Sequence, residues 1–416
     1  MRRLLKVTAM TGLLTLIKMA MGFVIAKIVA IYAGPTGMAM LGQVQSLVTG
    51  FNGVINAPTG NSVVKFTAQN AEKKYIDSSP WWRASLFWVL ILSAVIIPLG
   101  CFFSKELSYW VFHDRTLNWV VISTLISLPL TALGTFIISV INGLQHFRRY
   151  IWTGMTSAII SGAIVISMIV YGGLNGALLA LSIQYAVIAL IAIVINIKQP
   201  WFKMVFLWGK TSTSVKKDIL SYMLMAITSA LCLPIAMILI RNIMIGFVGW
   251  TQTGEWQAVW KISEVYLGVI TMALGAYYLP RLSQLNSADS IKKEIYSTSK
   301  LIVPIVFFLA VGVYLCRDIA ITILFTEEFR SARDLFLIQL LGDVVKIASW
   351  LFAYPMIARK ATKWFISTEI AFSLTWVLFT YLFVNIYGIH GANYAYLINY
   401  TLYFAFVFSN VNRFSK

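Results

Sequence analysis

Seven ionisable side chains stand inside long apolar stretches of this sequence, where a charge needs a partner or water to be stable. A charge at the centre of a bilayer costs roughly 2.5 kcal/mol or more, so each of these residues is a functional candidate. A lysine there can hold an anion, and a carboxylate can exchange a proton or a cation. The seven are four lysines and three acids: Lys18, Lys27, Lys261, Lys346, Glu264, Asp343 and Glu369.

Three lysines of the amino-terminal part are candidates for binding an anionic substrate. Lys18 stands in the middle of its apolar stretch with no acid within a helical turn, so it either faces a water-filled lumen or meets a partner on another helix. Lys27 falls roughly on the opposite side of an ideal helix, and both snorkelling to the interface and exposure to the lumen remain open for it. Lys65, at the inner end of the next stretch, completes this set.

Two acid–lysine pairs occur in the carboxy-terminal part, Lys261 with Glu264 and Asp343 with Lys346. Each pair is spaced i, i+3, which places both side chains on one helical face. Each can be a local ion pair that makes membrane insertion tolerable. Each can also face an aqueous lumen, with the lysine binding substrate and the acid serving coupling or ion pairing. Glu369, near the inner end of its stretch, is typical of an interfacial residue.

The composition indicates that membrane helices position these groups. Hydrophobic residues make up 59% of the 416 residues, and only 12% are charged. Soluble domains carry about a quarter of their residues as charged ones, so an ordinary soluble enzyme or a nucleic-acid-binding domain is excluded. No ATP-binding P-loop is present. The three cysteines and three histidines have no metal-ligand spacing, and neither a metal nor a cofactor is expected.

An all-α integral membrane fold with twelve transmembrane helices is predicted. A span needs roughly 20 mostly apolar residues. The expected spans cover residues 8–33, 37–66, 82–103, 117–141, 150–172, 174–197, 217–245, 255–280, 300–325, 333–358, 364–387 and 389–411. What remains is short loops, which leaves no room for a separate catalytic domain.

The basic residues predict the orientation of the chain. With the amino terminus in the cytoplasm, 23 of the 33 basic residues fall on the cytoplasmic side and six on the outer side. This bias predicts cytoplasmic amino and carboxy termini by the positive-inside rule. The six outer residues are Lys105, Arg115, Arg241, Arg317, Arg330 and Arg333.

The second half of the chain repeats the first at an offset near 215 residues. The clearest match sets Tyr171-Gly172-Gly173-Leu174-Asn175-Gly176-Ala177 beside Tyr387-Gly388-Ile389-His390-Gly391-Ala392. Parallel repeats of this kind are related by an axis along the membrane normal, with a substrate site between the halves near the midplane. The predicted domains are an amino-terminal six-helix lobe (1–197), a cytoplasmic interfacial linker (198–216) and a carboxy-terminal six-helix lobe (217–416).

A helix break is expected at Pro58-Thr59-Gly60, because proline and glycine both weaken a helix there. A bend used for gating and a static kink are both compatible with this signal.

Several motifs resemble those of Wzx-type flippases of O-antigen and lipid III, polysaccharide transporters of the multidrug/oligosaccharidyl-lipid/polysaccharide exporter superfamily. The resemblance covers nearly the whole chain. Its main carriers are Lys18, Lys27 and Gly34-Pro35-Thr36-Gly37 with Gln43 and Gln45, the stretch Lys261–Tyr266, and Arg333-Asp334-Leu335-Phe336 with Gln339, Gly342, Asp343 and Lys346. The stretch at Lys261 departs from the resembled pattern, which has Asp where this sequence has Glu264.

The resemblance implies two lobes around a MATE-like cationic central cavity and a role in lipopolysaccharide biosynthesis. The implied cargo is an undecaprenyl-diphosphate-linked oligosaccharide, moved by alternating access from the inner to the outer leaflet of the bacterial inner membrane. Lysines would hold the diphosphate. Membrane lipids are further partners, and a polysaccharide polymerase and a chain-length regulator are the proteins that such a role suggests.

Three alternatives remain open from the sequence. A MATE-like drug or metabolite exporter would favour acids over lysines in its cavity, because its cargo is commonly cationic. A membrane-embedded polysaccharide polymerase would be expected to show charged residues in a large outer loop, and the outer loops here are short. A scaffold role in a polysaccharide assembly complex is compatible with transport.

Overall fold

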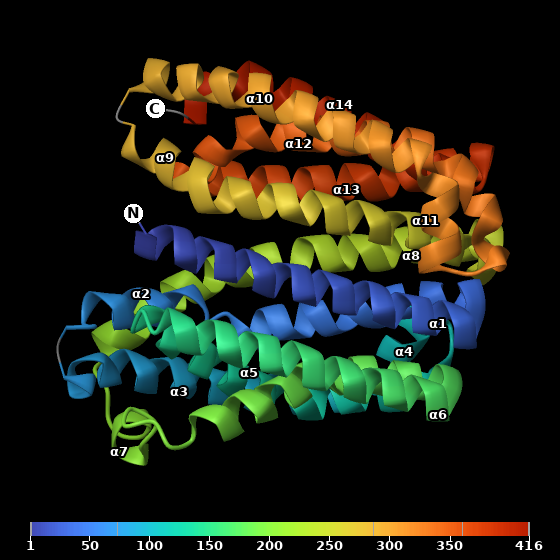
Figure 1. The fold of residues 1–416 in the computed structure, drawn as a ribbon. Helices are drawn as coiled ribbons and strands as arrows, with labels where there is room; N and C mark the ends of the chain where they lie inside the picture. The colour runs from blue at the N-terminus through green and yellow to red at the C-terminus, as the bar shows by residue number, and fades with distance from the viewer. Residues whose placement is uncertain (1, 73, 286, 360, 415–416) are drawn as a thin grey trace. The chain divides into compact units, whose positions relative to one another are not determined.

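The computed structural model describes residues 2–72, 74–285, 287–359 and 361–414, and this part of the chain forms helices and no strands (Figure 1). Three basic residues counted in the charge sorting, Lys73, Lys360 and Lys416, lie outside the described residues. The long helices and their short companions are α1 (Arg2–Asn56), α2 (Asn61–Gln69), α3 (Tyr75–Phe102), α4 (Ser104–Phe112), η1 (Arg115–Leu117), α5 (Asn118–Gly143), α6 (Phe147–Asn196), α7 (Met204–Leu207), α8 (Thr213–Ala273), η2 (Leu274–Tyr278), α9 (Leu279–Gln284), α10 (Ala288–Leu315), α11 (Arg317–Leu324), η3 (Glu327–Leu335), α12 (Phe336–Ala358), α13 (Thr362–Tyr387) and α14 (Ile389–Phe414).

The protein is a multi-pass membrane protein. Among the described residues, eight helices are long and apolar enough to cross a membrane. In lipid every backbone polar group needs an internal partner, which a helix supplies. Large apolar side chains are exposed along α10, such as Phe308 at 71% and Leu315 at 72%, as expected for a surface that faces lipid rather than water. The count of twelve spans stays a prediction.

Glycines in the left-handed region break the longest helices. Gly34 (φ 60°) divides α1, Gly173 (φ 54°) divides α6 and Gly249 (φ 81°) divides α8, while Gly388 (φ 58°) separates α13 from α14. Residues with a Cβ rarely adopt this conformation. Gly34 and Gly249 are 215 residues apart, as are Gly173 and Gly388, which is the offset of the repeat in the sequence. The backbone thus supports the repeat, although the arrangement in two lobes stays a prediction.

The break expected at Pro58 is present, because α1 ends at Asn56 and α2 begins at Asn61. The carbonyl of Pro58 accepts hydrogen bonds from the hydroxyls of Ser62 at 2.8 Å and Ser85 at 2.6 Å. Side chains therefore satisfy a backbone group that the interrupted helix leaves free.

Several helix ends differ from the expected spans. Helices α3 and α10 begin at Tyr75 and Ala288, well before the expected starts at 82 and 300. Helix α10 ends at Leu315, and the short α11 follows as a separate element. The apolar windows identified the bilayer-crossing part of each helix and missed the polar turns that extend it, because hydropathy does not report those turns.

Contacts divide the chain into two compact units. The first holds Met1–Tyr32 and Met40–Ile235, and the second holds Ala33–Ala39 and Ala236–Lys416. In the first unit α5 packs on α6, α3 and α2. In the second, α12 packs on α10 and α14, and α13 packs on α14 (Figure 1).

The stretch between α6 and α8 packs on α3 of the first unit. Trp201 is fully buried beside Trp82, with ring centroids 6.3 Å apart. Arg83 donates to the carbonyl of Val205, and the hydroxyl of Ser79 donates to the carbonyl of Phe206 at 2.9 Å. This segment is therefore held against the first unit at several points.

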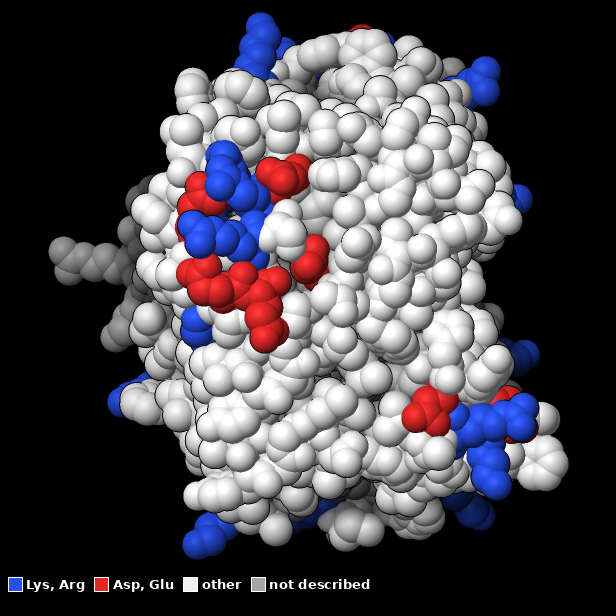
Figure 2. Space-filling view, turned by 90° about the vertical axis from the view of Figure 1, so that its right-hand side faces the viewer, with Lys and Arg blue, Asp and Glu red and all other residues white. Residues whose placement is uncertain are grey.

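Charged side chains are sparse on the face that Figure 2 shows, where they gather in small mixed groups within an uncharged surface. Around α11 and η3, Arg333 pairs with Asp318 at 3.5 Å and Arg330 pairs with Glu327 at 3.1 Å. Two of the basic residues assigned to the outer side are thus neutralised locally.

Candidate functional site

Lys18 lines a cavity of about 370 Å³ in the first unit. The cavity lies between the first part of α1 and both parts of α6, with Gln45 and Ile138 also in its wall. Among the described side chains, Lys18 is the only charged one that lines it. In the described part of the chain no carboxylate lies within ion-pair distance of Lys18.

Polar neutral groups complete the wall of the Lys18 cavity. They are two amides, two phenols and two hydroxyls: Gln45, Gln184, Tyr150, Tyr185, Ser157 and Ser161. Amides and hydroxyls both donate and accept hydrogen bonds, as sugar hydroxyls do. One ammonium group among such side chains suits a ligand that carries an anionic group next to hydroxyls.

Small residues allow α1 to lie close to α6 around this cavity. A Cβ on Gly154 would come within 2.8 Å of Leu14, and a Cβ on Gly162 within 2.3 Å of Met21. Both glycines are on the face of α6 that meets α1. The close approach places Lys18 beside the polar side chains of α6.

The structure does not place the other two amino-terminal lysines in this cavity wall. Lys27 is half-buried further along α1. Lys65 is exposed on α2, where its Nζ lies 5.4 Å from the ring centroid of Phe66. Their proposed role in substrate binding stays a prediction.

In the second unit, Lys261 and Glu264 form the ion pair that their spacing suggested, with Nζ and Oε2 3.2 Å apart. Trp260 donates from Nε1 to the other carboxylate oxygen of Glu264 at 3.1 Å. The side chain of Glu264 is 47% exposed and that of Lys261 16%. The carboxylate is therefore held by two donors and still open to exchange.

Asp343 and Lys346 make no such ion pair within the described residues, although they share the same spacing. Asp343 is fully buried. Its Oδ2 accepts from the phenol of Tyr266 at 2.6 Å, and its Oδ1 accepts from the phenol of Tyr396 at 2.8 Å. The carboxylate of Asp343 is thus hydrogen-bonded by tyrosines from α8 and α14 and forms no ion pair with Lys346.

Lys346 lies instead among aromatic rings. Its Nζ is 5.0 to 5.6 Å from the centroids of four of them, Trp350, Trp260, Tyr400 and Tyr396. Cations within about 6 Å of ring faces are attracted by the ring quadrupole. These rings therefore contribute to the stability of the ammonium group.

Arg241, one of the basic residues counted for the outer side, is an interior side chain of the second unit. It is buried in α8 with 3% of its surface exposed. Its Nε donates to Oε1 of Gln257 at 2.8 Å. The break at Gly249 lies midway between the two residues and folds α8 back on itself, so hydropathy alone could not reveal this contact.

The sequence analysis missed the tyrosines and tryptophans around Asp343 and Lys346. One signal was available, since Trp350 follows Lys346 by one helical turn and so shares its face. The contacts from α8 and α14 had no local signal. No group of three or more His, Cys, Asp or Glu able to hold a metal ion occurs in the part of the chain described.

Comparison with known proteins identifies relatives of the whole chain. The model of a family described as "Polysaccharide biosynthesis protein" matches residues 4–286. The chain is 27% identical over 412 residues to a protein named Lipid III flippase from Escherichia coli (strain K12), covering 97% of this chain and 96% of that one. A Lipid III flippase from Shigella flexneri matches to the same extent. The resemblance identified from the sequence motifs is thereby confirmed.

Solved structures of exporters share the fold. An inward-facing multidrug resistance MATE family transporter of the MOP superfamily superimposes with a TM-score of 0.70 at 16% identity, covering 95% of each chain. The inward closed conformation of Lipid II flippase MurJ gives a TM-score of 0.70 at 15% identity, over 99% of this chain and 90% of that one. The expected all-α, MATE-like membrane fold is confirmed.

Proposed function

The chain belongs to the family of polysaccharide biosynthesis proteins, and from this premise we propose that it is a flippase for a lipid-linked oligosaccharide. The cargo is an undecaprenyl-diphosphate-linked repeat unit, moved from the inner to the outer leaflet of the bacterial inner membrane. The amino and carboxy termini are cytoplasmic. Full-length similarity to proteins named Lipid III flippase supports this proposal.

The observation that carries the proposal is the cavity of Lys18. A diphosphate that crosses the membrane needs cations beside it, because an isolated charge in hydrocarbon has a high free energy. Among the described residues no carboxylate forms an ion pair with Lys18, so its charge is available to a ligand. Gln45 and Gln184 lie in the same wall and can hydrogen-bond the sugar that adjoins the diphosphate.

The proposed transport is by alternating access and includes no covalent step. Lys18 binds the diphosphate while the polyprenyl chain stays in lipid. When the ion pair between Lys261 and Glu264 breaks, Lys261 binds an anionic group of the cargo. Lys27, Lys65 and Lys346 remain candidates for further contacts with the head group.

The two candidates for coupling, Asp343 and Glu264, differ in burial and in their partners. Asp343 is fully buried and receives hydrogen bonds from two tyrosines, which suits a structural role. The side chain of Glu264 is half-exposed, and within the described residues its ion-pair partner is Lys261. We therefore assign coupling to a proton or cation gradient to Glu264.

Export of a cationic drug is the alternative that the MATE fold raises, and the Lys18 cavity disfavours it. None of the lining residues that the structure describes is acidic. A cationic cargo would meet an ammonium group without a carboxylate to offset it. A polysaccharide polymerase and a chain-length regulator remain proposed partners of the flippase.

A leaflet assay in proteoliposomes tests the function. Fluorescent undecaprenyl-diphosphate sugar is incorporated, and the fraction in the outer leaflet is followed by quenching. Wild type should move this lipid, and Lys18→Ala should slow the movement at least about tenfold, the loss expected for one charge-assisted contact. The matched control is Lys105→Ala, which removes an exposed lysine of α4 and should leave the rate unchanged.

If folded Lys18→Ala protein transports at the wild-type rate, the cavity is not the binding site. If wild type moves a cationic dye and not the polyprenyl lipid, the exporter alternative replaces the flippase.

A further inference from the structure

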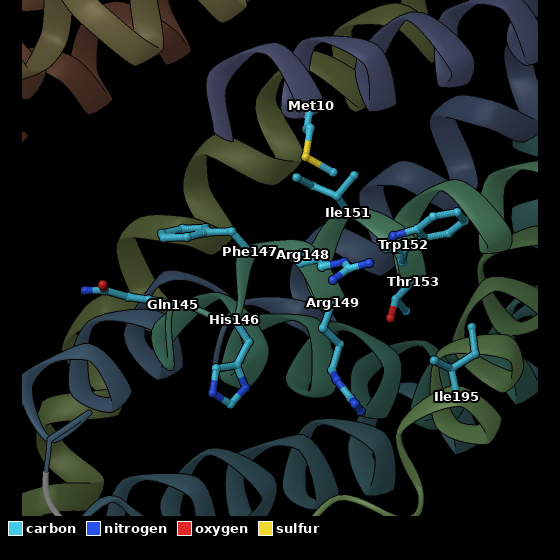
Figure 3. A pocket seen from close by; sticks show the side chains of 10 residues that line it. All are labelled: Met10, Gln145, His146, Phe147, Arg148, Arg149, Ile151, Trp152, Thr153 and Ile195. Atoms are coloured by element: carbon cyan, nitrogen blue, oxygen red, sulfur yellow. The ribbon is translucent and has the colours of Figure 1, made fainter. Parts of the chain in front are cut away.

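A second and larger cavity of the first unit lies where α6 begins. Its volume is about 980 Å³. Met10 of α1, the turn between α5 and α6, the first residues of α6 and Ile195 near its end form the wall (Figure 3). None of its lining residues also lines the Lys18 cavity, so the two are separate.

The charged side chains that are described in the wall of this cavity are basic. Arg148 and Arg149 line it together with His146, and none of the described lining residues is acidic. Neither arginine belongs to an ion pair in the described part of the chain. Each guanidinium therefore carries a positive charge that an anion bound in the cavity can offset.

The hydrogen-bonding capacity of these arginines is largely unused. Arg149 makes one long contact, from a terminal nitrogen to Oδ1 of Asn196 at 3.4 Å. The guanidinium of Arg148 has no hydrogen-bond partner among the described side chains and carbonyls, and the residue is exposed. Each guanidinium has five N–H donors in a planar fork that matches two phosphate oxygens. Donors for a phosphate group are therefore present on both residues.

The rest of the wall is apolar. Ile151, Met10, Phe147 and Ile195 contribute to it, and Trp152 is 58% exposed at its edge. Tryptophan is enriched where membrane helices leave the hydrocarbon for the headgroup region. A free phosphate ion would use the arginines and leave this apolar surface uncovered. A lipid whose head bears phosphate can use both.

The size of the cavity also favours a head group over a simple ion. Cavities that bind small organic ligands measure roughly 300–1,000 Å³, and this one lies at the top of that range. The distribution of basic residues assigns Arg148 and Arg149 to the cytoplasmic side. Anionic lipid is concentrated on that side of the membrane.

We infer that this cavity binds the phosphate-bearing head group of a membrane lipid from the cytoplasmic leaflet. Arg148 and Arg149 hold the phosphate, and Trp152 packs against the first atoms of the chain. The lipid is either a bulk anionic phospholipid or the polyprenyl diphosphate of the proposed cargo, which share this chemistry. Only the second source rests on the proposed function.

Native mass spectrometry of the full-length, delipidated protein in detergent measures the binding. Phosphatidylglycerol and undecaprenyl diphosphate are titrated separately, with phosphatidylcholine for comparison. The double variant Arg148→Ala/Arg149→Ala should bind at least one of the two anionic lipids about tenfold more weakly than wild type. The matched control is Lys198→Ala/Lys203→Ala. It removes two basic residues that the positive-inside rule also places on the cytoplasmic side, and it should bind like wild type.

The pattern of losses identifies the source. A loss for phosphatidylglycerol alone assigns the cavity to bulk lipid, and a loss for undecaprenyl diphosphate alone assigns it to cargo. A loss for both shows recognition of phosphate whatever the chain. Unchanged affinity for both lipids, or an equal loss in the lysine control, overturns the inference.

Two further variants keep the test independent of folding and of the proposed function. Arg149 contacts Asn196, so the double variant can lose stability. Arg148→Ala alone removes no hydrogen bond or ion pair to a described residue and should still weaken binding. In the Lys18→Ala background the double arginine variant should still bind more weakly than Lys18→Ala alone, because Lys18 lines the other cavity. A failed transport assay would therefore not remove the site, and a failed binding assay would not remove transport.

Discussion

The phenol of Tyr266 donates a hydrogen bond to Oδ2 of Asp343 at 2.6 Å, and this contact joins α8 to α12. On the other oxygen, Tyr396 brings in α14 at 2.8 Å. A buried carboxylate is stable only when hydrogen bonds replace the water that it lost. The two tyrosines thus make Asp343 a junction of three helices in the second unit.

Removing one of these phenols should destabilise the protein. Tyr266→Phe or Tyr396→Phe removes one hydrogen-bond donor from a buried carboxylate, at a cost of about 1–3 kcal/mol. The midpoint of thermal unfolding of the purified protein should fall in both variants. Tyr171→Phe is the control, because Tyr171 is 91% exposed, and its midpoint should equal that of wild type. Wild-type midpoints in both buried-site variants would contradict the junction.

The charge of Lys346 should matter more for transport than for stability. Lys346→Met keeps most of the apolar stem among the aromatic rings and removes the ammonium group. The cation–π attraction that is lost amounts to about 0.5–2 kcal/mol, partly offset because no charge remains to be buried. The unfolding midpoint should change little while transport of the polyprenyl lipid falls. Normal transport by folded Lys346→Met protein would remove this lysine from the candidate substrate contacts.

Arg241 should be required for folding. In Arg241→Met the amide oxygen of Gln257 loses its donor inside the hairpin of α8, and the helix segments lose their polar link. The expected cost is about 3 kcal/mol, in the range measured when one partner of a buried polar contact is removed. Arg330→Met serves as the control, since that side chain is 76% exposed. Equal yields and unfolding midpoints for the two variants would show that Arg241 contributes little.

Two glycines at equivalent positions of the repeat should respond alike to alanine. A Cβ on Gly176 would lie 1.9 Å from the carbonyl oxygen of Met168, and a Cβ on Gly391 would lie 2.2 Å from that of Phe383. Either substitution forces the backbone apart, so both Gly176→Ala and Gly391→Ala should reduce the free energy of unfolding by about 2 kcal/mol or more. The midpoint of thermal unfolding should fall accordingly in both variants.

The neighbouring Gly172 is the control for this pair. Nothing lies within 4 Å of a Cβ there, so Gly172→Ala should be neutral or slightly stabilising. If only one of the two glycine variants is destabilised, the repeat does not extend to these helix crossings.

The sequence predicted the features of this fold that depend on neighbouring residues. The apolar stretches, the break at Pro58 and the ion pair of Lys261 with Glu264 follow from composition and helical spacing. The matched sequence around Gly173 and Gly388 also indicated the repeat that the backbone angles support.

Contacts between distant segments could not be predicted in this way. Tyr266 and Asp343 are far apart in the chain, and their spacing carries no periodic signal. Arginine is strongly hydrophilic, so hydropathy did not indicate that Arg241 is buried. Its contact with Gln257 depends on the helix break at Gly249. The residues around Lys18 come from α1, α5 and α6, so only the packing of these helices reveals that they share one cavity.

The attachment of the segment after α6 has a consequence for engineering the chain. Because Trp201 is buried and Thr211 donates to the carbonyl of Pro80 at 2.9 Å, this stretch is an integral part of the first unit. Trp88 extends the attachment to Lys216, whose carbonyl accepts from its indole at 3.0 Å. A two-gene version of the protein, cut between the sequence repeats, would place new chain ends inside this packing. Its amino-terminal fragment should retain the whole stretch through Lys216 to keep the core around α3 closed.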